Sequence, residues 1–115
     1  MPIIPRRFHA TLDYLWSGAI AKAPNLCGFA ENEAATNYCR AQAAVATSAS
    51  LFTDYELGLA KAIPFSAHLK LDLAGAFVGL AAPWLLGFAD NKRARNTVLA
   101  FAIVELAVVA LSRHD

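Results

Sequence analysis

The 115-residue chain is long enough for one domain, and its composition differs from that of an ordinary soluble domain. Hydrophobic residues make up 57 % and charged residues 17 %, and the mean hydropathy is +0.42. The formal net charge of +1 excludes the basic surface typical of nucleic-acid-binding proteins. Alanine dominates while glycine and proline are sparse, so the composition predicts an apolar, all-α protein with no nucleic acid among its partners.

The sequence contains an internal duplication with an offset of 59 residues. Residues 4–56 align with residues 63–115 without a gap, and about 17 of the 53 aligned pairs are identical. The identical pairs gather in groups: Ile4-Pro5 with Ile63-Pro64, His9 with His68, Leu12-Asp13 with Leu71-Asp72, Pro24 with Pro83, and Gly28-Phe29-Ala30 with Gly87-Phe88-Ala89. Such a period is the signature of a duplicated structural unit. We therefore expect a first repeat, residues 1–59, and a second repeat, residues 60–115, to form one domain together.

In the first repeat, the predicted helices at residues 9–29 and 38–53 are interrupted by polar residues. The first contains Asp13, Lys22 and Pro24, and the second is rich in Ala, Ser and Thr. The charges also argue against a signal peptide at the N-terminus. Small residues suit close helix packing within a membrane bundle, and the correspondence with the second repeat favours two membrane spans here.

In the second repeat, helices are predicted at residues 66–88 and 96–112, with Asp90–Asn96 as a charged turn. The first is long enough to cross a hydrocarbon core of about 30 Å. The second is apolar around its whole circumference, with Glu105 as its only charge. We therefore predict four transmembrane helices in two tandem hairpins of the same orientation. The alternative is a soluble four-helix bundle, but the second repeat lacks the polar stripe that such a bundle would show to water.

The end of the first helix in the second repeat carries a motif with a family resemblance. Ala82-Pro83-Trp84 is followed by Leu-Leu-Gly-Phe. Together with the tandem two-helix unit, this motif resembles the SPW repeat family of small bacterial integral membrane proteins, over most of residues 60–112 and more faintly over residues 4–56. The serine of the family name is replaced by Ala82, and the first repeat reads Ala23-Pro24-Asn25. The resemblance implies a multi-pass protein of the bacterial cytoplasmic (inner) membrane and no particular activity.

The same motif has a direct structural interpretation. Pro83 lacks an amide donor and is expected to kink the helix or end its regular part. Trp84 would then lie at the membrane–water interface, where indole buries its ring and keeps its N–H hydrated. Gly87 permits the turn that follows. We interpret these three residues as a helix stop and interface anchor.

His9 and Asp13 are four residues apart, and His68 and Asp72 repeat that spacing in the second unit. On a helix this spacing places both side chains on one face, about one turn apart. Because the two repeats share one orientation, we expect the two pairs at the same depth, with Glu105 in the same leaflet. Ionisable groups at that depth are costly and normally face the interior of a bundle.

Three interpretations of this polar intramembrane cluster remain open. In the structural one, each histidine bonds to the aspartate of its own face and ties helices together. In the second, His9 and His68 bind a metal ion or a haem, since imidazole and carboxylate are common metal ligands. In the third, the cluster relays protons or ions, because histidine titrates near neutral pH. Glu105 has Ala46 as its counterpart, and we expect it to be buried and paired. Lys70 either neutralises Glu105 or extends its ammonium group to the membrane interface.

Cys27 and Cys39 are the only cysteines, and they lie equally far from the centre of the turn near Glu33. Antiparallel helices would place them at similar depth, so one interpretation is a disulfide. The other is a pair of small apolar residues, because their repeat counterparts are Leu86 and Val98.

The sequence favours a structural or accessory subunit that packs against partner transmembrane helices in a larger membrane complex. The small, polar residues of the first repeat motivate this, because protein solvates such a surface better than lipid does. The expected partners are the lipid bilayer and either another membrane protein or further copies of the chain. A first alternative is a membrane haem or metal-binding redox component using His9 and His68, and a second is a minimal transporter of protons, ions or small solutes. We expect no enzymatic activity, because the chain contains no catalytic motif, and the sequence requires no cofactor.

Overall fold

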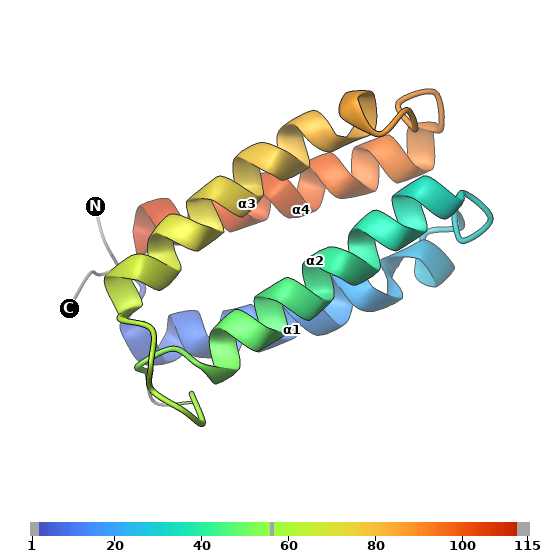
Figure 1. The fold of residues 1–115 in the computed structure, drawn as a ribbon. Coiled ribbons are helices and arrows are strands. Elements are labelled where there is room, and N and C mark those ends of the chain that lie inside the picture. The colour runs from blue at the N-terminus through green and yellow to red at the C-terminus, as the bar shows by residue number, and fades with distance from the viewer. Residues whose placement is uncertain (1–2, 56, 113–115) are drawn as a thin grey trace.

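A computed structural model describes residues 3–55 and 57–112 of the chain. Within these residues it contains four helices, α1 (Arg6–Leu26), α2 (Glu33–Leu51), α3 (Phe65–Leu85) and α4 (Lys92–Leu111), and no strand beyond two isolated bridges. α1 packs along α2 and α3 packs along α4, which gives two helical hairpins that lie side by side and touch each other sparingly (Figure 1). The predicted all-α fold is confirmed.

An asparagine caps the start of the second helix in each hairpin. The side chain of Asn32 accepts a hydrogen bond from the amide of Ala35 at 3.0 Å, and Asn91 does the same for Ala94 at 3.1 Å. Asparagine is among the best N-cap residues because it satisfies one of the free amides of the first turn. The predicted starts at residues 38 and 96 were therefore wrong: α2 begins at Glu33 and α4 at Lys92, and most of the charged segment 90–96 is helical.

A glycine follows the end of the first helix in each hairpin. Gly28 and Gly87 both have φ of +77°, which L-residues with side chains rarely adopt. The next amide then turns back onto the helix: Phe88 donates to the carbonyl of Pro83 at 2.9 Å, as in a Schellman-type cap. The proline does not itself end the helix, because α3 continues to Leu85, and the turn is made at Gly87 as expected.

At the opposite end of the bundle, two isolated backbone bridges join one hairpin to the other. Ile4 pairs with Ser112, and Thr53 pairs with Ile63. These two bridges correspond under the 59-residue offset, so the duplication in sequence is also a duplication of these contacts. One bridge joins the start of α1 to the end of α4, and the other joins the end of α2 to the start of α3.

The apolar core is divided into two clusters. The larger lies toward the hairpin turns and includes Ile20, Phe29, Phe88 and Val98, while the smaller, toward the termini, consists of Ala10, Tyr55, Phe65 and Leu69. Buried polar residues and a cavity lie between and beside these clusters. The apolar core is therefore not continuous along the bundle.

Two of the four helices, α3 and α4, are long and apolar enough to cross a membrane, with mean hydropathies of 1.2 and 1.8 over their best windows. α1 and α2 do not reach the same measure among the described residues. Large apolar side chains are exposed on both hairpins, including Leu15 and Val45 on the first and Phe77 and Ile103 on the second. Trp84 is also exposed, near the end of α3.

Candidate functional site

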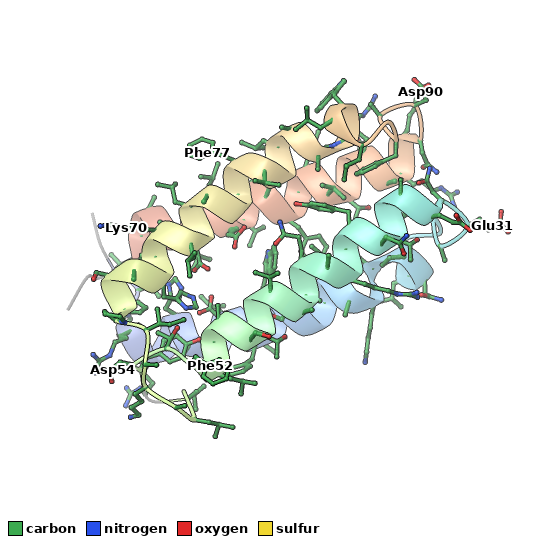
Figure 2. The ribbon with its side chains drawn as sticks, viewed as in Figure 1. Glu31, Phe52, Asp54, Lys70, Phe77 and Asp90 are labelled. Carbon is green, nitrogen blue, oxygen red and sulfur yellow. The ribbon has the colours of Figure 1, made fainter. Side chains whose placement is uncertain are left out.

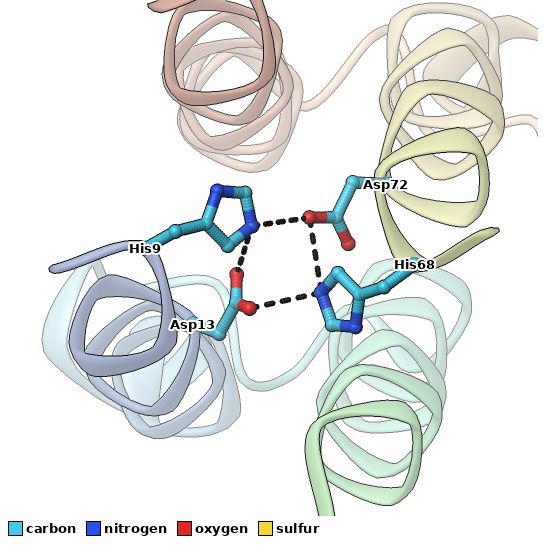
Figure 3. A group of neighbouring side chains, drawn as sticks. All are labelled: His9, Asp13, His68 and Asp72. Carbon is cyan, nitrogen blue, oxygen red and sulfur yellow. Dashed lines mark hydrogen bonds and ion pairs between the residues drawn. The ribbon is translucent and has the colours of Figure 1, made fainter. Parts of the chain in front are cut away.

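The two predicted pairs of histidine and aspartate meet in the centre of the bundle and form a closed ring. His9 and Asp13 come from the beginning of α1, and His68 and Asp72 from the beginning of α3 (Figure 3). One ligand atom from each residue lies within 4.8 Å of all the others. Both histidines are buried, and the two aspartates are 12 % exposed. We call these four residues the His/Asp ring.

The shortest contacts in the ring run between the hairpins. His9 Nε2 lies 2.9 Å from Asp72 Oδ2 and 3.2 Å from Asp13 Oδ1. His68 Nε2 lies 2.8 Å from Asp13 Oδ2 and 3.2 Å from Asp72 Oδ2. The expectation that each histidine bonds to the aspartate of its own face was therefore incomplete, because α1 and α3 lie diagonally across the bundle and their side chains meet at its centre, where the opposite aspartate is closer (Figure 3).

The outer nitrogen of each histidine bonds to a hydroxyl group from the end of a neighbouring helix. His9 Nδ1 lies 2.6 Å from Ser112 Oγ, and His68 Nδ1 lies 2.7 Å from Thr53 Oγ1. Each hydroxyl in turn donates its hydrogen to the backbone carbonyl four residues earlier, at 2.5 Å. Because a hydroxyl has one hydrogen, it must accept from the imidazole, so both Nδ1 atoms carry a proton.

This assignment determines what the inner nitrogens can do. With Nδ1 protonated, each Nε2 is either a second N–H donor on a charged imidazolium or a free lone pair. A lone pair facing carboxylate oxygens at 2.8–3.2 Å is repelled unless a proton or a metal ion lies between them. His68 Nε2 is buried, and despite its short ion-pair distances the angles there do not complete a hydrogen bond to either aspartate. The ring therefore has two stable forms, two ion pairs or a bound metal ion.

Aromatic residues enclose the ring on one side. Phe65 packs edge-on against His9 with 5.2 Å between ring centroids, and Tyr55 lies 5.4 Å from His68. Tyr55 donates a hydrogen bond from its hydroxyl to Asp13 Oδ2 at 3.1 Å. Burial, and then the charge of Asp13, raise the pKa of the Tyr55 hydroxyl, so it remains a donor. Asp13 is thereby held in place by three neighbours.

Glu105 does not belong to the ring, but it lies beside it. Glu105, Asp13 and Asp72 line one cavity of about 360 Å³ between α1 and α4. Lys70, suggested by the sequence as a neutralising partner, points away from the bundle into its surroundings (Figure 2). Glu105 was expected to be paired. Within residues 3–55 and 57–112 this expectation was wrong, because no cationic side chain lies within ion-pair distance of its carboxylate.

The remaining predicted residues lie away from the ring. Pro83, Trp84 and Gly87 are at the turn end of α3, and they contribute nothing to the cluster. Cys27 and Cys39 are free thiols, so the disulfide interpretation does not hold in this structure. Cys27 is exposed where α1 ends, whereas Cys39 is buried in the larger apolar cluster, so the two thiols have different surroundings.

Sequence reasoning missed the two hydroxyl groups that orient the histidines. Thr53 and Ser112 correspond under the 59-residue offset, but they are similar and not identical, so a count of identities passes over them. Their shared hydroxyl was the available signal. Tyr55 was also missed, because nothing in the sequence indicates that the loop after α2 folds over the ring.

Comparison of the chain with protein-family models, with curated proteins and with solved structures gives no match. The function of the chain is therefore inferred from the geometry of its site.

Proposed function

We propose that this chain is an integral membrane protein that binds one divalent transition-metal ion in its His/Asp ring. The observation that carries the proposal is the orientation of the two histidines. Both Nδ1 atoms donate to hydroxyl groups, while both Nε2 atoms face two carboxylates across a buried centre. In metal sites the non-ligating nitrogen of histidine typically donates to an outer hydrogen-bond partner, which fixes the tautomer.

The dimensions of the ring suit a small ion. Zinc bonds to imidazole nitrogen and carboxylate oxygen at about 2.0–2.2 Å, so tetrahedral ligand atoms lie about 3.3 Å apart. The neighbouring ligand atoms of the ring are 2.8–3.2 Å apart and all four lie within 4.8 Å of one another, so binding requires neighbouring atoms to separate slightly and the atoms across the ring to approach. Two imidazoles and two carboxylates suit zinc, iron(II), cobalt(II) or manganese(II) better than calcium or magnesium.

A haem does not fit the same geometry. A porphyrin held by two axial histidines must lie between their Nε2 atoms. Here Asp72 Oδ2 occupies that space, at 2.9 Å from His9 Nε2 and 3.2 Å from His68 Nε2. The two imidazole centroids are 5.5 Å apart and nearly perpendicular. Of the cofactors considered from the sequence, a single metal ion is the one that the side chains support.

The arrangement of the hairpins supports membrane insertion of all four helices. α3 and α4 have the length and hydropathy of membrane spans. α1 and α2 are of similar length and lie alongside them, with the ring holding the beginnings of α1 and α3 at one level (Figure 1). If the second hairpin crosses a bilayer, the first is carried to the same depth. The likeness to the SPW repeat family remains a prediction that agrees with this proposal.

A structural role is the second candidate, and one observation favours it. The shortest contacts of the ring join α1 to α3, across a boundary where the hairpins otherwise touch sparingly. Two imidazolium–carboxylate pairs would clamp the hairpins together without a metal. The outer face of the first hairpin also carries a groove of small residues, including Gly18 and Ala44, which suits packing against a partner helix.

Cobalt(II) binding separates the metal site from the clamp. The purified protein in detergent, stripped of metal, is titrated with Co²⁺ and its visible absorption is recorded. We expect one ion per chain with the absorption bands of a coordinated ion, and none in a His9→Gln, His68→Gln variant. Asp13→Asn, which removes one carboxylate ligand, should also weaken Co²⁺ binding. Its control is Asp54→Asn, which should leave binding unchanged, because Asp54 is an exposed carboxylate on the loop after α2 (Figure 2).

Unfolding of the same samples completes the test. A metal site predicts that Co²⁺ stabilises the wild type, by about 2.7 kcal/mol at one hundred times its dissociation constant, and leaves the double variant unchanged. A wild type that takes up no ion, while the double variant unfolds more easily, would refute the metal site and leave the clamp.

Labelling of introduced cysteines tests the four-span arrangement. With Cys27 and Cys39 replaced by alanine, single variants Glu31→Cys, Asp90→Cys and Asp54→Cys are treated with a membrane-impermeant thiol reagent. Positions 31 and 90 should react from one side of the membrane and position 54 from the other. If 31 and 54 react from the same side and 90 from the opposite side, the first hairpin does not cross the bilayer.

A further inference from the structure

A cavity of about 360 Å³ lies between α1 and α4, next to the His/Asp ring. Its walls are mostly apolar, and α1 and α4 supply most of them, while α2 and α3 close its inner side. Leu15 and Val104, which are both more than half exposed, form its rim. A concave apolar site with a few polar groups at one end is the usual form of a small-molecule pocket.

The polar groups at this pocket are three carboxylates, of which two are already compensated. Asp13 and Asp72 belong to the ring. With two imidazolium groups and no metal, the ring has no net charge; with two neutral imidazoles and a divalent ion, it again has none. The ring therefore contributes no net charge to the pocket in either form, with or without a metal ion.

Glu105 is the carboxylate without compensation. It is half-buried in the wall of the pocket, and its carboxylate oxygens reach toward α3, 3.5 and 3.7 Å from where a Cβ would stand on Gly75. Among the described residues no lysine, arginine or histidine pairs with it. A carboxylate in such surroundings favours a cationic partner that arrives from outside the chain.

An aromatic pair contributes to the wall of the pocket. Trp16 and Phe101 meet edge to face, with 5.8 Å between their centroids. Trp16 also donates from its indole Nε1 to the backbone carbonyl of Phe101 at 3.1 Å, which fixes the orientation of the indole. Indole and phenyl faces attract organic cations, so they add to the attraction of Glu105.

The residues that give this pocket its character have no equivalents in the other copy of the duplicated unit. The 59-residue offset relates Trp16 to Gly75, Phe101 to Gln42, and Glu105 to Ala46. The ring is preserved in both repeats, whereas the aromatic wall and the acidic group exist in one seam alone. These three differences occur together at one cavity, and together they produce one chemical character.

We propose that this pocket binds a small amphiphilic organic cation, an amine or quaternary ammonium group on an apolar or aromatic body. The ammonium group would lie at Glu105 and the apolar body against the side chains of Trp16 and Phe101 that line the pocket. The rim at Leu15 and Val104 gives the ligand entry from the apolar surroundings of the bundle, without passage through the hairpin loops.

Two probes of the same shape test the inference. Benzyltrimethylammonium carries the charge, and neopentylbenzene replaces its nitrogen with carbon. Binding is followed by the fluorescence of Trp16 in a Trp84→Phe background, because the exposed Trp84 would otherwise add signal from the far end of α3. We expect the cation to bind the wild type at least tenfold more tightly than its neutral counterpart.

Replacing the carboxylate isolates the contribution of Glu105. Glu105→Gln should lower the affinity for the cation about tenfold or more while neopentylbenzene binds as before, which also shows that the pocket is intact. Glu31→Gln, the same change on the loop between α1 and α2, should alter neither (Figure 2). Equal binding of the two probes, an unchanged cation affinity in Glu105→Gln, or no saturable binding of either probe to the wild type would overturn the proposal.

Discussion

The hydroxyl groups that orient the two histidines give the sharpest test of the proposed site. Ser112→Ala and Thr53→Val each remove one acceptor, at 2.6 Å from His9 Nδ1 and 2.7 Å from His68 Nδ1. Both hydroxyls are fully buried, so water does not easily replace them. Loss of an outer partner of a metal-ligating histidine typically costs 10–100-fold in metal affinity, or about 1.4–2.7 kcal/mol.

The expected result is thus a weaker affinity for Zn²⁺ by about one to two orders of magnitude in each variant, measured by titration calorimetry in detergent. The two losses should be similar, because the contacts are related by the duplication. Without metal, each variant should also unfold more easily, by about 1.5–3 kcal/mol if the lost bond came from a charged imidazolium. Ser48→Ala, an exposed hydroxyl on α2, is the matched control and should change neither quantity.

Proton release gives an independent measure of the same reasoning. If both imidazoles are doubly protonated without metal, binding of an ion expels about two protons per chain. The binding enthalpy should then depend on the ionisation enthalpy of the buffer. A Zn²⁺ affinity that stays within twofold of the wild type in Ser112→Ala, despite a lower stability, would show that His9 does not bind the ion through the inferred tautomer.

Four stability predictions concern residues that shape the helices and their turns. Gly79→Ala should destabilise by about 1–3 kcal/mol, because its new Cβ would lie 2.9 Å from the Cβ of Ala102 and force α3 from α4; an unchanged unfolding midpoint would contradict this packing. Gly87→Ala should cost about 1–2 kcal/mol because of its positive φ, whereas Gly18→Ala, in open space within α1, should stabilise by up to about 1 kcal/mol. Asn91→Ala should cost about 1 kcal/mol through loss of the N-cap of α4, measured as a lower unfolding temperature.

The duplication was the feature of the sequence that predicted most of the fold. It indicated two equivalent hairpins, and hence that His9 and His68 would lie at one level. Helix starts were predicted too late, because hydropathy was followed in place of the capping pattern at Asn32 and Asn91. Hydropathy marks where a helix can be buried, whereas the first turn is determined by which side chain satisfies its free amides.

The pairing within the ring could not be obtained from spacing alone. A separation of four residues explains why Asp13 can reach His9, but the closer partner of His9 is Asp72 of the other hairpin. That contact depends on how the two hairpins are arranged around the centre of the bundle, which no local pattern contains. The absence of a cation paired with Glu105 among residues 3–55 and 57–112 has the same origin, because the direction of a long side chain such as Lys70 is determined by its surroundings.

The duplicated contacts also explain why neither hairpin can form the site alone. Thr53 of the first repeat orients His68 of the second, and Ser112 of the second orients His9 of the first. The shortest nitrogen-to-oxygen contacts likewise join residues of different repeats. A single repeat therefore supplies one imidazole and one carboxylate, without the hydroxyl that orients its own histidine.

Formation of the site is consequently coupled to the association of the two hairpins. The hairpins touch each other much less than their own helices do, and the ring is one of the contacts that hold them together, beside the two apolar clusters and the backbone bridges. An ion that binds the closed ring and not the separated hairpins must stabilise the closed bundle by the same free energy. Because the cavity beside Glu105 lies in the seam between α1 and α4, closure of the hairpins also determines its width. Occupation of the ring and occupation of the pocket are therefore expected to affect each other through the geometry of this one boundary, with equal and reciprocal changes in affinity.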